Sequence, residues 1–114
     1  MSPDAIPQID AHEGAARTPG SALLLDVRNP NEFEAGHAPH AVLIPLPELT
    51  DRMSELDANV PIVVICRSGG RSQAAAELLA ASGYDVVNLI GGMQAWQADG
   101  LDVVADGDQP GTVL

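Results

Sequence analysis

The chain has 114 residues, a length typical of one domain, and carries five arginines against sixteen acidic residues, for a formal net charge of -11. A surface this acidic repels phosphate backbones and anionic lipids, so nucleic acids and membrane surfaces are poor candidate partners. One cysteine excludes an internal disulfide, a C-x-x-C redox pair and a multi-cysteine metal site.

Five short apolar segments are predicted to be strands, because turn residues or prolines bound them. In chain order they cover 6–9, 22–27, 41–45, 62–66 and 85–90. The segment 62–66, "IVVIC", is predicted to be fully buried and gives the strongest strand signal of the five.

Helices are predicted between these strands from capping residues and from apolar spacing. They cover 10–17 with Asp10 as the cap, a stretch from Pro30 to the stop at Gly36, a segment from Leu46 to Leu56, 72–82 before Gly83, and 93–99 around Trp96. Alternating apolar strands and helices predict an α/β fold, with a mostly parallel sheet covered on both faces. Residues 1–101 are expected to form one domain, and the acidic, Gly/Pro-rich segment 102–114 to form a mobile tail.

The first ten residues, "MSPDAIPQID", contain no basic region and no apolar run of signal-peptide length. No other segment is long and apolar enough to span a bilayer. The sequence therefore predicts a cytoplasmic protein.

The loop after the strongest strand, "CRSGGRS", concentrates unusual residues. In parallel sheets ligands collect at the carboxyl ends of strands, and Cys66 lies at such an end. If a helix begins near Gly70, the backbone N–H groups of 67–71 curl around one point, since glycines reach φ values that other residues resist. The first turn of that helix adds unpaired N–H groups and a positive dipole end. Together with Arg67 and Arg71, this loop is predicted to bind a small anion.

A cysteine sulfur among such donors is stabilised as the thiolate, which is nucleophilic without a neighbouring base. The alternative is that Cys66 is a small buried hydrophobe, the usual state of a free cysteine. A core thiol gains nothing from two arginines and a Gly-Gly pair, so the nucleophile is favoured. Four residues separate Cys66 from Arg71, whereas cysteine-dependent phosphatases use C-x5-R. The tighter loop has room for one additional sulfur atom.

These features resemble the single-domain rhodanese-like sulfurtransferases over residues Ile6 to Leu101. The resemblance rests on three ordered motifs: "LLLDVRNPNEFEAGHAPHAVLIPL", "CRSGGRS" and "LIGGMQAW". It implies a rhodanese-like domain with a parallel five-stranded sheet flanked by helices. It also implies that Cys66 accepts sulfane sulfur as a persulfide, held by the N–H groups of Arg67 to Arg71. An arginine directly after the cysteine is similar to members that use thiosulfate.

The expected reaction transfers sulfur from thiosulfate to a thiophilic acceptor, such as cyanide or a cellular thiol, protein thiols included, and requires no cofactor or metal. A persulfide carrier loaded by a partner enzyme is the first alternative, because the same loop serves both roles. A small phosphatase or arsenate reductase is a weaker one, since both the C-x4-R spacing and Ile65 before the cysteine argue against it.

Three charged residues near the end of the second strand are expected to support the site. Asp26 and Arg28, with Glu32 within reach, are predicted to form a structural ion pair that orders the loop. Ser68 is expected either to donate its hydroxyl to substrate or simply to suit a tight turn. His40 stands where the family usually has glycine, and a positive φ there would be reached at some cost.

Overall fold

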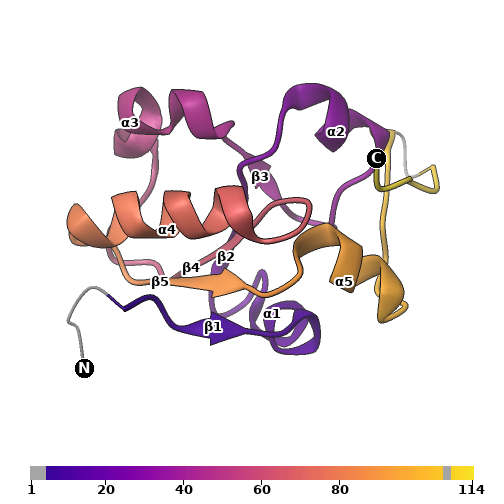
Figure 1. Ribbon diagram of the computed structural model, residues 1–114, viewed down its shortest axis with the longest axis horizontal. Coiled ribbons are helices and arrows are strands. Elements are labelled where there is room, and N and C mark those ends of the chain that lie inside the picture. The colour runs from indigo at the N-terminus through magenta and orange to yellow at the C-terminus, as the bar shows by residue number, and fades with distance from the viewer. Residues whose placement is uncertain (1–4, 107–108) are drawn as a thin grey trace.

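The computed structural model describes residues 5–106 and 109–114 of the chain, and contains one five-stranded sheet (Figure 1). Its strands are β1 (Gln8–Ile9), β2 (Leu23–Asp26), β3 (Val42–Leu43), β4 (Ile62–Ile65) and β5 (Val86–Leu89). They lie in the order β1-β5-β4-β2-β3, and every pair is parallel. The predicted parallel five-stranded α/β fold is confirmed.

The central strand β4 is buried at all four residues, as its unbroken run of branched apolar side chains predicted. Its neighbour β2 runs in register with it, so that Asp26 pairs with Ile65 at the carboxyl end. The loops that follow these two strands therefore leave the sheet side by side. This register brings the residues after Asp26 toward the loop at Cys66.

Two apolar layers cover the sheet, because successive strand residues point to opposite faces. On one face, Leu25 and Val64 pack against Leu49 and Leu79 from α3 (Leu49–Arg52) and α4 (Gly70–Ala81). On the other face, the layer includes Leu24, Val63 and residues of α1 (Ala11–Arg17) and α5 (Gly92–Ala98). The short helix α2 (Pro30–Ala35) follows β2. Figure 1 shows α4 and α5 following the ends of β4 and β5.

One predicted helix differs in type from the structure, and another begins before the segment whose composition favoured a helix. The segment from Leu46 to Leu56 is not one helix: 3-10 turns η1 (Leu46–Glu48) and η2 (Met53–Glu55) flank the four-residue α3. The segment still buries Leu49, in α3, and Leu56, just after η2, so the apolar spacing gave the correct inward face but not the helix type. Helix α4 begins at Gly70, as the loop motif predicted and two residues before the segment 72–82, because Gly69 makes the preceding turn with a φ of 116°.

The described part of segment 102–114 is hydrogen-bonded to the domain, which the prediction of a mobile tail did not anticipate. Val104 exchanges backbone hydrogen bonds with His37 at 2.9 Å each, and Thr112 N–H donates to the Ala35 carbonyl at 2.8 Å. Residues 1–4 and 107–108, which belong to the expected domain and tail, lie outside the described residues. The mobility expected from composition stays a prediction. Among the described helices, none has the length and apolar character needed to cross a membrane.

Candidate active site

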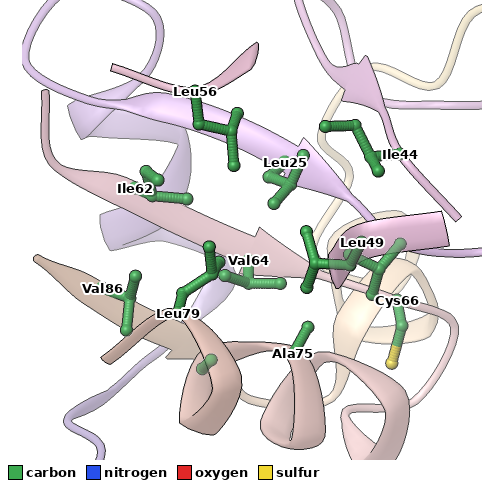
Figure 2. Close-up of a cluster of buried hydrophobic side chains, with 12 residues drawn as sticks. Leu25, Ile44, Leu49, Leu56, Ile62, Val64, Cys66, Ala75, Leu79 and Val86 are labelled. Carbon is green, nitrogen blue, oxygen red and sulfur yellow. The ribbon is translucent and has the colours of Figure 1, made fainter. Parts of the chain in front are cut away.

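Cys66 directly follows β4, and only 1% of its surface is exposed. Its side chain belongs to the edge of the apolar layer, but Figure 2 shows the sulfur pointing away from the labelled aliphatic side chains. The sulfur accepts hydrogen bonds from the Gly69 backbone N–H at 3.0 Å and from the Ser72 hydroxyl at 3.3 Å. The thiol is therefore buried with polar partners and differs from an inert core cysteine.

The beginning of α5 holds the first two peptide groups of this loop. The Met93 N–H donates to the Cys66 carbonyl at 2.7 Å, and the Gln94 N–H donates to the Arg67 carbonyl at 3.0 Å. In a trans peptide the N–H and the C=O point in opposite directions. The N–H groups of Arg67 and Ser68 are therefore turned away from α5.

Several loop N–H groups have no backbone acceptor. Within residues 5–106 and 109–114, none of the N–H groups of Arg67, Ser68, Gly70 and Arg71 donates to a backbone carbonyl. Gly69 lies in the left-handed region, a conformation that glycine adopts without steric cost. This loop, with the first turn of α4, therefore supplies a group of donors suited to an anion beside Cys66.

Opposing effects act on the pKa of the Cys66 thiol, and the net result is a pKa below the usual range. Burial raises the pKa, because it disfavours the charged thiolate. Hydrogen bonds from the Ser72 hydroxyl and from the backbone N–H groups of Ser72, Gly69 and Ser68 lower it and outweigh burial. The thiolate is thus stabilised mainly by directed hydrogen bonds.

Arg71 makes a two-pronged ion pair with Glu32 of α2, at 2.6 and 2.9 Å. This contact lowers the pKa of Glu32 to about 2, although burial opposes the shift. The pKa of Arg71 is raised, first by Glu32 and to a lesser degree by Cys66. Arg71 therefore connects α2 to the cysteine loop, and Glu32 offsets much of its charge.

The expected ion pair of Asp26 and Arg28 is present, and both side chains are fully buried. Arg28 Nε donates to both Asp26 carboxylate oxygens at 3.0 and 3.1 Å, and Nη2 donates to Asp26 at 2.8 Å and to the Gly36 carbonyl at 2.8 Å. The proximity of Glu32 in sequence suggested that it would join this pair, but it makes no direct hydrogen bond with Asp26 or Arg28 among those described. It pairs with Arg71 instead, which lies 39 residues away in the chain.

Arg67 has a different environment from Arg71. Its side chain is exposed, and its Nε donates to the main-chain oxygen of Leu114 at 2.6 Å. Arg17, Arg28, Arg52 and Arg71 each contact a carboxylate. Among the arginines, all of which lie in the described ranges, Arg67 alone makes no ion pair with Asp or Glu.

His40 lies outside the thiol site, with a φ of 67°, the left-handed conformation suggested by the glycine usual at this position. It borders a cavity of about 190 Å³ whose other lining residues are Ala15, Thr18, Pro39, Trp96, Leu101 and Asp102. No residue of the loop 66–71 lines that cavity.

Sequence reasoning missed two polar side chains near the loop. Ser72 is fully buried and reaches the Cys66 sulfur, although it ends the motif "CRSGGRS" and the sequence pattern gave it no role beyond the first residue of the segment 72–82. Asn88 of β5 approaches the Gly69 carbonyl at 3.4 Å. Its polar side chain inside an otherwise apolar strand, "VVNLI", was the available signal.

Comparisons with known proteins agree with this architecture. Residues 10–99 match the family model of the rhodanese-like domain. A curated sulfurtransferase of Allochromatium vinosum is 43% identical over 84 residues, which cover 73% of this chain and 78% of the relative.

Solved structures show the same similarity. A rhodanese-related protein from Thermoplasma volcanium superposes with a TM-score of 0.82 at 34% identity, covering 86% of this chain and 97% of the other. Reduced CoADR-RHD of Bacillus anthracis superposes with a TM-score of 0.77 at 34% identity, and the match covers 80% of this chain but only 16% of that longer chain. The chain belongs to the rhodanese-like sulfurtransferase family.

Proposed function

We propose that this protein transfers sulfane sulfur from thiosulfate through a persulfide on Cys66 to a thiophilic acceptor such as cyanide or a cellular thiol. The observation that supports it most is the pairing of a low-pKa thiol with loop N–H groups that have no backbone acceptor among the described residues. Such donors stabilise negative charge on an outer sulfur atom. No metal or cofactor takes part in the proposed steps.

The reaction has two displacement steps. The Cys66 thiolate attacks the outer sulfur of thiosulfate, the S–S bond of the donor breaks, and sulfite leaves with the bonding electron pair. The terminal sulfur of the resulting persulfide is then attacked by the acceptor. With cyanide, thiocyanate leaves and the thiolate of Cys66 is regenerated, so atoms and electrons balance.

The two loop arginines have separate roles in this proposal. Arg67 attracts the thiosulfate dianion and stabilises the departing sulfite, because it is exposed and makes no ion pair with Asp or Glu among the described residues, although its Nε donates to the main-chain oxygen of Leu114. Arg71 is held by Glu32, so it mainly fixes the end of the loop and contributes less net charge to substrate binding. Ser68 contributes its N–H to the sulfur, independently of its hydroxyl.

A free thiol nucleophile works best where disulfides do not form, so the proposal includes a cytoplasmic location. The direct test is thiocyanate formation from thiosulfate and cyanide by the native protein and by Cys66→Ala. We expect turnover in the native protein and loss of turnover in the variant, with far-UV circular dichroism unchanged. Full activity of Cys66→Ala would refute the proposal.

The sulfur donor that loads Cys66 distinguishes an enzyme from a carrier. If thiosulfate gives no turnover but a cysteine desulfurase loads sulfur onto Cys66, a persulfide carrier replaces the proposed enzyme. If neither donor loads Cys66, both roles are excluded.

A further inference from the structure

Asn88 is a polar residue in an apolar position. It lies on β5 with 4% of its surface exposed, between Val87 and Leu89. Its Oδ1 has no hydrogen-bond partner among the described residues, which is a cost to folding that an apolar side chain would avoid. Its Nδ2 donates to Gln8 Oε1 at 2.8 Å and has further acceptors at 3.3 Å, Gln73 Oε1, and at 3.4 Å, the Gly69 carbonyl.

The Gly69 carbonyl receives three donors. Besides Asn88, they are the Gln73 N–H and the Ser72 hydroxyl, each at 3.1 Å. A carbonyl oxygen has two lone pairs, so two donors are enough to satisfy it. Gln73 and Asn88 can supply both.

The Ser72 hydroxyl has one proton and two acceptors within reach. One is the Gly69 carbonyl, and the other is the Cys66 sulfur at 3.3 Å. The proton can serve only one of them at a time. Any group that satisfies the Gly69 carbonyl therefore favours the hydrogen bond from Ser72 to the sulfur.

We propose that Asn88 is a positioning residue for sulfur transfer: by donating to the Gly69 carbonyl, it leaves the Ser72 proton free to be donated to Cys66. This inference rests on the proposed function for its role in transfer. Asn88 does not touch the sulfur and acts through Gly69 and Ser72. The unsatisfied Oδ1 is then the cost of presenting an N–H group at this position.

The test is the pH dependence of Cys66 alkylation by iodoacetamide, which reports the thiolate fraction without any sulfur donor. Four proteins are compared: native, Ser72→Ala, Asn88→Leu and the double variant. We expect Ser72→Ala to raise the midpoint by about one unit, since one hydrogen bond to the thiolate is lost. Asn88→Leu is expected to raise the midpoint by about half a unit, because the contact from Asn88 to the Gly69 carbonyl is longer than the contact from Ser72 to the sulfur.

The double variant distinguishes an indirect effect from a direct one. If Asn88 acts through Ser72, the double variant has the same midpoint as Ser72→Ala. Additive shifts, or a native midpoint in Asn88→Leu, would overturn the inference. Gln8→Leu is the matched control: it removes the shortest hydrogen bond of Asn88 but leaves an Asn88 N–H available to the Gly69 carbonyl, so its midpoint is expected not to rise above the native value.

Asn88→Val serves as the second variant should leucine prevent folding, since a β-branched side chain suits a buried strand. The same two outcomes apply to it. These midpoints are independent of sulfur transfer, so their failure removes only the role of Asn88. Failure of the proposed function would instead appear as turnover that persists in Cys66→Ala.

Discussion

The backbone N–H of Met93 donates a hydrogen bond to the carbonyl of Cys66 at 2.7 Å, which joins the start of α5 to the thiol loop. Gly92, the residue before Met93, has a φ of 56° and touches the same loop. A Cβ at Gly92 would overlap the Cys66 carbonyl oxygen and lie 2.7 Å from the Arg67 carbonyl carbon. The motif "LIGGM" therefore helps to set the direction of the loop peptides.

Gly92→Ala is expected to destabilise the protein by more than about 2 kcal/mol, because both the backbone conformation and the backbone contact oppose a methyl group. Urea denaturation measures this difference. Gly83→Ala is the control, since Gly83 also has a positive φ, 92°, but has no atom within 4 Å of the added Cβ. Its expected cost is about 1 kcal/mol. Equal losses in the two variants would contradict the role assigned to Gly92.

Arg67→Ala is expected to raise the KM for thiosulfate about tenfold, with a smaller effect on kcat, because the exposed guanidinium attracts the dianion before reaction. Added salt should weaken substrate binding in the native protein more than in the variant. Arg52→Ala is the control, because Arg52 pairs with Glu48 and Glu55. A native KM in Arg67→Ala would show that the dianion is bound without this residue.

Glu32→Gln is expected to lower stability near neutral pH by about 1–2 kcal/mol. This is less than the pKa shift of Glu32 alone would give, because the Arg71 side chain is 35% exposed and solvent screens the pair. The pKa of Glu32 falls from 4.5 to about 2 on folding. Its carboxylate therefore stabilises the fold above about pH 4.5, and this contribution is lost as the pH falls toward 2.

Urea denaturation at a series of pH values measures this effect. The free energy of unfolding of the native protein should fall as the pH drops from about 4.5 toward 2, and Glu32→Gln should lack the part of this fall that comes from protonation of Glu32. Glu55→Gln is a control for an exposed ion pair, which contributes little to stability. Identical acid dependence in the native protein and Glu32→Gln would rule out the proposed contribution.

The Cys66 thiol is expected to titrate at lower pH in the folded protein than in the same chain unfolded in urea, because the hydrogen bonds of the loop outweigh burial. Alkylation rates over a range of pH measure both midpoints, so the unfolded chain is its own reference. A folded midpoint at or above the unfolded one would mean that burial prevails.

Much of the fold could be predicted from local sequence, because each strand is a short apolar run and each long loop contains turn residues. Strand ends were less accurate. The predicted strand 6–9 is longer than β1, in which Gln8 and Ile9 are the residues in register with β5. Pairing depends on the neighbouring strand, and periodicity within one segment does not contain that information.

The thiol loop could also be predicted, since Cys66 and its backbone donors lie within one short segment. The contacts of this loop with side chains from other elements could not be predicted. Glu32 reaches Arg71 across 39 residues, and Asn88 reaches Gly69 across 19. These contacts depend on which strand ends lie side by side, and that arrangement follows from the sheet order β1-β5-β4-β2-β3.

Intact-mass measurement after exposure to thiosulfate tests the central claim most directly. The native protein should gain the mass of one sulfur atom, a reductant should remove it, and peptide mapping should place it on Cys66. Cys66→Ala should gain none. A native protein that stays unmodified, or sulfur found on the Cys66→Ala variant, would contradict a Cys66 persulfide as the intermediate.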